Sequence, residues 1–251
     1  MRYVFAGDRY LSCEILKFLV ENNQKPLALF VSENDKSTHN EELISISNLD
    51  DEFIFRGNEF KSEICLELLD GFSLDYIIGI HFPYIFPSKV LNIPKVGVIN
   101  LHPAFLPYNK GWNTPTWAIL DNTIYGATLH FMTEEFDGGD IIHQKKLDVA
   151  FTDTANTLYQ KVLNLEKEVF IEAFEDLLTL NPNMSKQVTN GTSHVKKDLK
   201  SVQEVSLENN VNVFEFINKL RALTTSDINE AATITIDGKK IAIQIQLEEL
   251  P

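Results

Sequence analysis

The amino-acid sequence predicts an α/β fold with a mainly parallel, twisted sheet, plus a small C-terminal helix and β-hairpin unit. Two observations support this prediction: short apolar runs alternate with amphipathic segments along most of the chain, and a second apolar pattern follows a polar connection near residue 200. With 251 residues, 44% of them hydrophobic, the chain can bury a full core and a small appendage. We expect one main domain over residues 1–200 and an extension over residues 201–251.

The first half of the chain has the pattern of repeated strand and helix units. An apolar run at 3–7 ends at a glycine, and Leu11, Ile15 and Leu19 follow on one helical face. Further strands are predicted at 27–31, 53–55 and 76–80, with a helix marked by Phe60, Ile64 and Leu68 before the last of them.

The second half continues the sheet and then changes character. Strands are predicted at 96–101, 125–132 and 141–149, and a long helix at 154–180. Residues 181–206 are polar and predict a connection. A helix at 213–223 and a hairpin turning at Asp237-Gly238 predict the C-terminal unit.

Composition excludes several classes of protein. Acidic residues number 36 against 22 Lys and Arg, so the net charge of -14 opposes nucleic-acid binding. The two cysteines, Cys13 and Cys65, indicate neither a disulfide framework nor a zinc ribbon. The N-terminal apolar run is too short for a signal peptide, and no run approaches the roughly 18 apolar residues of a membrane span. We therefore expect a cytoplasmic protein with no membrane association.

The strand at 96–101 runs into a polar sequence at its carboxyl end, where ligands bind in open α/β sheets. Side chains alternate along a strand, so Asn100 and His102 point to the same side. Pro103 and Pro107 stiffen the exit from this strand. On its own, the pair is also consistent with a capped strand end whose polar groups satisfy a turn.

A second polar motif, Asp137-Gly138-Gly139-Asp140, follows the next predicted strand. Its glycines permit a tight backbone, and its two carboxylates are available for acid–base chemistry. Taken alone, this motif is more typical of a solvated turn or a cation loop. Calcium is disfavoured because the longer ligand spacing of an EF-hand is absent.

Together, Asn100-Leu-His102-Pro and Phe136-Asp137-Gly-Gly-Asp140 resemble the formyltransferase family that uses N10-formyltetrahydrofolate. Segments 111–119 and 126–130 reinforce the resemblance. It implies a Rossmann-like formyltransferase core and transfer of a formyl group from the folate N10 to an amine. Asn100 would then stabilise the oxyanion and His102 would act as the base. Asp137 would orient His102 and relay a proton.

The resemblance also implies where the folate donor binds. His81, Phe82 and Tyr84 lie in the segment that the family presents to the pterin ring, and Asp140 would support the pterin-binding loop. The aromatic residues are equally consistent with core packing. His130 lies in an apolar strand and is expected to be a core histidine. No metal is expected, because no residue cluster has a ligand spacing typical of a metal site.

Members of this family formylate glycinamide ribonucleotide, methionyl-tRNA or amino sugars carried on nucleotides. The acidic charge and short tail disfavour tRNA, and the extra helix and hairpin disfavour the ribonucleotide. Segment 109–117 looks most like sugar-nucleotide N-formyltransferases. We expect a dTDP-linked amino-dideoxy sugar for surface polysaccharide such as O-antigen in lipopolysaccharide. Candidate contacts to this acceptor are Arg9, Lys110, Trp112 and Arg221.

The sequence disfavours two other classes of function. A non-catalytic nucleotide-binding module is disfavoured because all three catalytic residue types stand at matching positions. A dehydrogenase is disfavoured because the turn at 7–12 lacks the second and third glycines of the dinucleotide fingerprint. The exposed edge of the predicted hairpin favours pairing of two chains into a homodimer.

Overall fold

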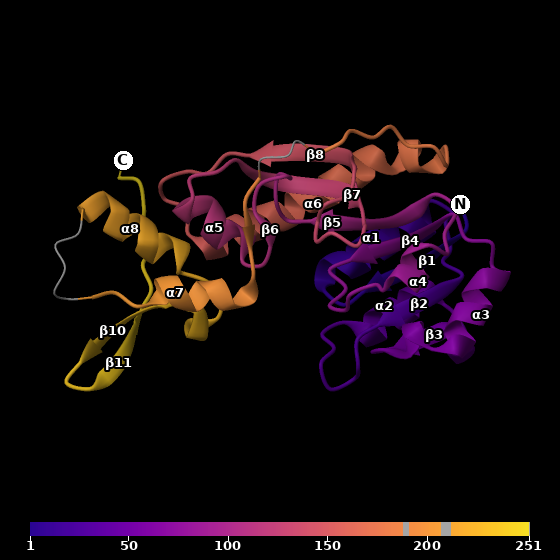
Figure 1. Ribbon diagram of the computed structural model, residues 1–251, viewed down its shortest axis with the longest axis horizontal. Coiled ribbons are helices and arrows are strands. Elements are labelled where there is room, and N and C mark those ends of the chain that lie inside the picture. The colour runs from indigo at the N-terminus through magenta and orange to yellow at the C-terminus, as the bar shows by residue number, and fades with distance from the viewer. Residues whose placement is uncertain (188–190, 207–211, 251) are drawn as a thin grey trace. The chain divides into compact units, whose positions relative to one another are not determined.

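The computed structural model describes residues 1–187, 191–206 and 212–250. In this part of the chain the main sheet has the strand order β3-β2-β1-β4-β5-β7-β8 (Figure 1). Strands β1 to β5 pair in parallel, and β7 pairs antiparallel to β5. The predicted mainly parallel sheet is confirmed. The strands are β1 (Tyr3–Gly7), β2 (Ala28–Val31), β3 (Ile54–Arg56), β4 (Tyr76–Ile80), β5 (Gly97–His102), β7 (Tyr125–Phe131) and β8 (Ile141–Leu147).

α-Helices and two small ladders accompany the main sheet. The helices are α1 (Tyr10–Glu21), α2 (Asn40–Ser47), α3 (Glu63–Gly71), α4 (Ser88–Leu91), α5 (Thr114–Leu120), α6 (Ala155–Leu178), α7 (Leu199–Gln203) and α8 (Val213–Ala222). Strands β6 (Lys110–Gly111) and β9 (Ser193–His194) pair in parallel, and β10 (Ala232–Ile236) and β11 (Lys239–Ile243) form an antiparallel hairpin.

The chain divides into two compact units, and elements β7, β8 and α6 contribute residues to both. The first unit comprises Met1–His102, Thr128–His143 and Glu166–Gln187. The second comprises Pro103–Ala127, Gln144–Leu165 and Val188–Pro251.

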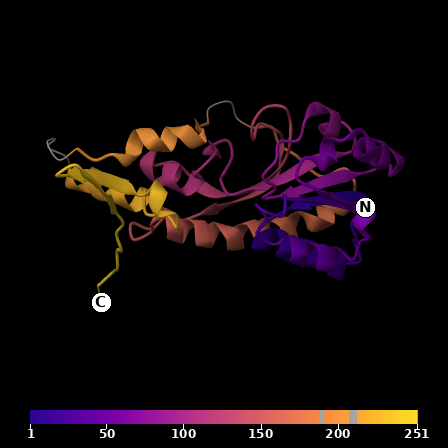
Figure 2. The same ribbon diagram turned by 90° about the horizontal axis from the view of Figure 1, so that it is seen from below.

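In the first unit, both faces of the sheet are covered. On one face, Phe18 of α1 packs edge-on against Phe174 of α6, with 5.0 Å between the ring centroids. On the other face, Val4 and Phe30 join the core cluster that also contains residues of α3. Figure 2 shows α1 and α6 on one side of these strands and α3 on the other. Burial on both faces explains why the strands are apolar throughout.

The phase of helix α3 differs from the predicted one. The sequence pattern placed Phe60, Ile64 and Leu68 on the buried face, but Ile64 is 79% exposed. The Ser62 hydroxyl caps the helix by accepting a hydrogen bond from the Cys65 amide, and the helix begins after it. Phe60 therefore lies outside the helix, and α3 buries Cys65 and Leu69 instead.

The turn from β1 to α1 is hydrogen-bonded to the last residue of the neighbouring strand β4. The Ser12 hydroxyl donates a hydrogen bond of 2.6 Å to the Ile80 carbonyl at the end of β4. A Cβ atom on Gly7 would lie 2.6 Å from the Cβ of Ser12, so this approach requires glycine. The residue after Ile80 is His81, so this contact holds the exit of β4 in place.

In the second unit, the C-terminal elements form their own core. Leu199, Val205, Leu220, Leu223 and Ala232 pack together in a hydrophobic cluster. The hairpin turn is as predicted, with positive φ at both Asp237 and Gly238. The segment predicted as a connection, 181–206, contains β9 and α7 in addition.

Among the described residues, no helix is both long and apolar enough to cross a lipid bilayer.

Phe60 tests the packing of the first unit, because it is fully buried and contacts the rings of Phe30, Phe82 and Phe86. We expect Phe60→Ala to lower the free energy of unfolding by about 3–5 kcal/mol, measured by urea denaturation. The exposed Ile64→Ala is the matched control and should change it by less than about 0.5 kcal/mol. Equal losses in both variants would contradict the assignment of Phe60 to the core.

Candidate active site

The antiparallel pairing of β5 and β7 brings two polar side chains together in the first unit. Asn100 lies opposite His130 in the register of the two strands, and His102 lies opposite Thr128. The Asn100 Nδ2 atom is 3.4 Å from the His130 Nε2 atom. Both residues therefore occupy one face of the sheet near the carboxyl end of β5.

A backbone contact sets the tautomer of His130. Its Nδ1 atom lies 2.8 Å from the Phe131 carbonyl oxygen, which can only accept, so Nδ1 carries a hydrogen. In the neutral imidazole the Nε2 atom then has a lone pair and accepts from the Asn100 amide. This hydrogen bond uses one of the two amide hydrogens of Asn100 and leaves the other to be directed elsewhere.

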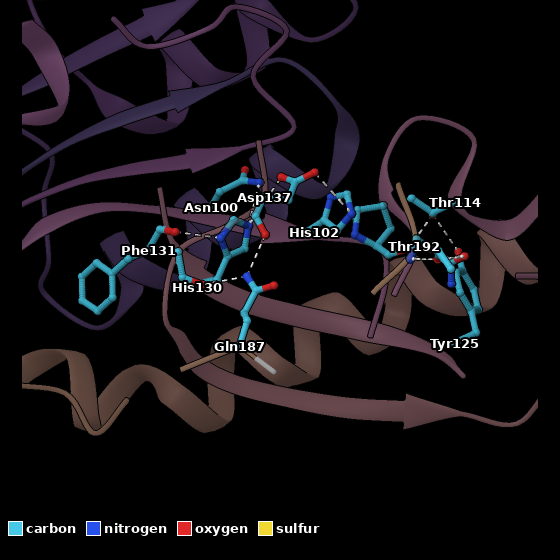
Figure 3. A network of polar contacts seen from close by, with 12 residues as sticks. Asn100, His102, Thr114, Tyr125, His130, Phe131, Asp137, Gln187 and Thr192 are labelled. Carbon is cyan, nitrogen blue, oxygen red and sulfur yellow. Dashed lines mark hydrogen bonds and ion pairs between the residues drawn. The ribbon is translucent and has the colours of Figure 1, made fainter. Parts of the chain in front are cut away.

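The Asp137 carboxylate lies between two imidazoles (Figure 3). Its Oδ2 atom is 3.7 Å from the His102 Nε2 atom, and its Oδ1 atom is 3.8 Å from the His130 Nε2 atom. These are ion-pair separations, longer than hydrogen bonds. The side chains of His102, His130 and Asp137 are at most 10% exposed, so the Asp137 carboxylate acts on both imidazoles with little screening.

The turn that carries Asp137 is held by backbone contacts. Asp137 has a positive φ of 48°, which is uncommon outside glycine. The Phe131 amide donates to the Asp140 carbonyl, and a Cβ atom on Gly139 would lie 1.9 Å from the Phe131 carbonyl oxygen. The Gln187 side-chain amide donates hydrogen bonds of 2.7 Å to the carbonyls of both Asp137 and Gly139.

The structure thus brings together the three predicted catalytic residues, Asn100, His102 and Asp137, and adds His130 and Gln187 to them. His130 is a buried histidine with hydrogen-bond partners, and its place beside the predicted catalytic residues is what the sequence did not indicate. His130 is buried, but it contacts Asn100 and faces Asp137. The alternation of Thr128 and His130 along a strand next to Asn100 was the available signal. No signal in the sequence identified Gln187, because it is a single polar residue in a polar segment.

His81 follows β4 and makes a buried ion pair. Its Nε2 atom lies 3.0 Å from Oε1 and 3.1 Å from Oε2 of Glu166, a fully buried residue of α6. Burial alone would lower the pKa of His81, but attraction and hydrogen bonding to Glu166 outweigh burial and the effect of Arg9, so the pKa is raised. His81 also has a positive φ of 53°. The imidazole is held against Glu166, which leaves it little freedom to contact a ligand.

Phe82 and Tyr84 pack into the aromatic cluster beside this pair. The ring of Phe82 stacks on Phe86 with centroids 5.4 Å apart. The Tyr84 hydroxyl accepts a hydrogen bond from the Glu33 amide. Both side chains are half-buried, so each keeps some aromatic surface accessible.

The four residues predicted to contact the acceptor differ in their surroundings. Arg9, in the first unit, is 60% exposed and lies 3.9 Å from Asp8. In the second unit, Lys110 belongs to β6, and Trp112 is 49% exposed with the Lys196 ammonium 5.4 Å from its ring centre.

Arg221, also in the second unit, is buried rather than placed at the surface to meet an acceptor. It is 5% exposed, its Nη1 atom donates to the Phe151 carbonyl at 2.6 Å, and its guanidinium lies over the Phe151 ring. A guanidinium engaged in this way serves the interior of the second unit. The spacing of apolar residues along α8 could not distinguish a structural role of Arg221 from ligand binding, because the same spacing is expected in both cases.

The described residues contain no group of three or more His, Cys, Asp or Glu side chains placed to hold a metal ion.

A carboxamide, an imidazole and a carboxylate beside the carboxyl end of a parallel strand define an α/β enzyme equipped for acyl transfer. The chain belongs to the formyl transferase family, whose sequence profile matches residues 12–174. Residues 198–249 match the N-formyltransferase dimerization C-terminal domain. The protein is therefore an enzyme that transfers formyl groups, and the resemblance seen in the sequence is confirmed.

Similar proteins include formyltransferases with different acceptors. A dTDP-4-amino-4,6-dideoxyglucose formyltransferase from Mycobacterium bovis is 28% identical over 69% of this chain and 74% of its own length. A methionyl-tRNA formyltransferase from Lachnospira eligens is 26% identical over 97% of this chain and 78% of its own length.

Solved structures extend the similarity over the whole chain. A sugar N-formyltransferase from a Shewanella species has a TM-score of 0.82 and 25% identity, covering 100% of this chain and 99% of that one. The sugar 3N-formyl transferase WlaRD, solved with dTDP and 5-N-formyl-THF, has a TM-score of 0.69 and 21% identity, covering 96% and 84% of the two chains. At that identity it supports the fold alone.

The His81–Glu166 pair predicts a pH dependence of stability. Because the pKa of His81 is raised in the folded state, the pair stabilises the fold fully below the ordinary imidazole value of about 6.5. This contribution is lost as the pH rises through the raised folded-state pKa. Glu166→Gln should cost about 3 kcal/mol of unfolding free energy in mild acid and clearly less in alkali. Urea denaturation at several pH values measures the difference.

The matched control is the exposed pair of His143 and Glu172, whose atoms are 2.9 Å apart in the same unit. Glu172→Gln should cost about 0–1 kcal/mol at every pH. A cost of Glu166→Gln that does not vary with pH would contradict the assignment of a charged His81.

Proposed function

We propose that this enzyme transfers the formyl group of N10-formyltetrahydrofolate to the amine of a nucleotide-linked amino-dideoxy sugar. The observation that carries the proposal is the cluster of Asn100, His102 and Asp137 in the first unit. Its residue types are those needed for attack of an amine on a formyl carbon: an oxyanion donor, a base and a carboxylate. Sugar N-formyltransferases among the similar proteins support the acceptor class.

Asn100 is assigned to the developing oxyanion. One of its amide hydrogens is used by the Nε2 atom of neutral His130, which fixes the plane of the carboxamide. The second hydrogen is then available to the oxygen of the formyl group. A preorganised donor of this kind lowers the barrier by about 3–4 kcal/mol.

His102 is assigned as the base that accepts a proton from the attacking nitrogen. Asp137 stabilises the resulting imidazolium from 3.7 Å. The proton then returns through this pair to the nitrogen that loses the formyl group. His130 is less suited to the role of base, because its Nε2 lone pair is engaged by Asn100.

Two segments suit the folate donor, which supplies the activated formyl carbon when it is bound. Phe82 and Tyr84 offer half-exposed aromatic surface to a flat ring, and the turn from Asp137 to Asp140 is assigned to the same donor. We assign His81 to support of the first segment, since its imidazole is held by Glu166. No metal is required by this chemistry.

For the acceptor we propose a dTDP-linked 4-amino sugar destined for a surface polysaccharide such as O-antigen. The similarity to the mycobacterial dTDP-4-amino-4,6-dideoxyglucose enzyme supports this choice. Within the second unit, Lys110 is assigned to the diphosphate and Trp112 to a flat ring of the acceptor.

Methionyl-tRNA is the main alternative acceptor, because an enzyme of that specificity matches 97% of the chain. A net charge of -14 opposes it, since tRNA binding depends on neutralising many phosphates. Glycinamide ribonucleotide is disfavoured by the additional C-terminal unit. A non-catalytic module is disfavoured by the intact catalytic cluster.

We further propose a homodimer formed through the C-terminal unit, in the cytoplasm. The match of residues 198–249 to a dimerization domain supports the dimer. Exposed apolar residues on the hairpin, among them Ile236 and Ile241, offer a surface for it. Cys13 and Cys65 are both free thiols, which suits a reducing compartment.

The catalytic assignment is tested by kinetics of three variants. His102→Asn should lower kcat by about 10²–10⁴-fold, and Asp137→Asn should remove most turnover, while folate binding is retained. Asn100→Ala should lower kcat by about 100-fold or more. His143→Asn, at a half-exposed histidine in the same unit, is the control and should keep normal turnover. Normal kcat in any of the three would remove that residue from the mechanism.

The acceptor assignment is tested with a panel of dTDP-, UDP- and GDP-linked amino sugars, read by mass spectrometry for one added formyl group. Binding energy from the nucleotide should raise turnover as well as affinity, so the free amino sugar should lose about 100-fold or more in kcat/KM. A chelator should change neither result. Formylation of methionyl-tRNA or glycinamide ribonucleotide, with every nucleotide sugar refused, would contradict the assignment.

A further inference from the structure

The Gln187 side chain is bound to the catalytic turn in an unusual way. Its Nε2 atom donates two hydrogen bonds of 2.7 Å, one to the Asp137 carbonyl and one to the Gly139 carbonyl. Figure 3 shows it reaching the turn from the side opposite Asn100. Because one amide nitrogen spans two carbonyls, it fixes the backbone on both sides of Gly138.

The orientation of this amide is determined by its surroundings. A flipped amide would place its oxygen against two carbonyl oxygens, which repel it. In the observed orientation the Oε1 atom of Gln187 is buried and has no hydrogen-bond partner within the described residues. A buried acceptor without a partner destabilises the folded state. A side chain kept in that state beside a catalytic group is expected to serve the site more than the fold.

The position of the turn decides where the Asp137 carboxylate lies. Its oxygens are 3.7 Å from His102 and 3.8 Å from His130, nearly midway between the two imidazoles. A shift of the backbone by a few tenths of an ångström toward either side would favour one imidazole over the other. The positive φ of Asp137 means that this backbone conformation needs support from its surroundings.

We propose that Gln187 is a positioning residue for formyl transfer, which holds the 137–139 turn so that the Asp137 carboxylate faces both His102 and His130. The inference rests on the proposed function for its kinetic consequence, but its structural part does not. Without the two hydrogen bonds, the carboxylate no longer stabilises the His102 imidazolium from a fixed place.

Two variants separate positioning from stability. Gln187→Leu removes the donors and the unpartnered acceptor at similar volume, and Gln187→Glu replaces the donors with acceptors that face two carbonyls. Each should lower kcat by about 10- to 100-fold and change the KM values by less than about threefold. The thermal stability of Gln187→Leu should fall no more than that of its control.

The matched control is Gln203, whose Nε2 atom also spans two carbonyls, at 2.7 Å to Asn229 and 3.3 Å to Ala231, within the second unit. Gln203→Leu should keep the wild-type kcat. An equal loss of kcat in Gln203→Leu, an unchanged kcat in Gln187→Leu, or a change in KM alone would each overturn the proposal.

A measurement without substrate completes the test. The ¹³C–¹H imidazole resonances of the six histidines can be assigned with single His→Asn variants. Those of His102 and His130 should shift in Gln187→Leu and stay in place in Gln203→Leu. Unmoved resonances would overturn the positioning role. If the wild-type enzyme formylated no acceptor in the panel, the proposed function would fail, and these resonances alone would decide the role of Gln187.

Discussion

The antiparallel pairing of β7 with β5 is the constraint on which the rest of the site depends. Because β7 runs antiparallel to β5, it places His130, near its own carboxyl end, directly opposite Asn100. The same pairing leaves the chain, after Phe131, next to the strand that carries His102. A short turn is then sufficient to return Asp137 to the two imidazoles.

Two imidazoles beside one carboxylate have different roles because of a single backbone carbonyl. The contact with Phe131 assigns the hydrogen of His130 to Nδ1 and commits its Nε2 lone pair to Asn100. His102 is left as the imidazole suited to accept a proton. The tautomer of His130 thus commits that histidine to orienting the Asn100 carboxamide and leaves proton transfer to His102. Both histidines nevertheless face the same Asp137.

The sequence predicted what depends on local pattern and missed what depends on tertiary contacts. Strand β4 was predicted to the residue, and the alternation of Asn100 and His102 placed both on one face. The burial of Arg221 had no local signature, because charge in a helix suggests a surface. The phase of α3 was set by the capping hydroxyl of Ser62. The contact of His130 with Asn100 was not predicted, because His130 lies in an apolar strand. Gln187 acts on residues 50 and 48 positions away, a distance that no periodicity reveals.

The site is held by polar contacts that lie outside the regular elements. The sheet fixes where each strand ends, but not the path of the segment that follows it. After β4 that path is fixed by the buried pair of His81 and Glu166, and after β7 by the side-chain amide of Gln187. Each involves a buried polar group that an apolar core would avoid, and each supports a residue with positive φ. These buried polar groups lower the stability of the fold, but they fix the positions of two backbone segments. One segment is assigned to the folate donor and the other to the catalytic step, and both need a defined geometry in a formyltransferase.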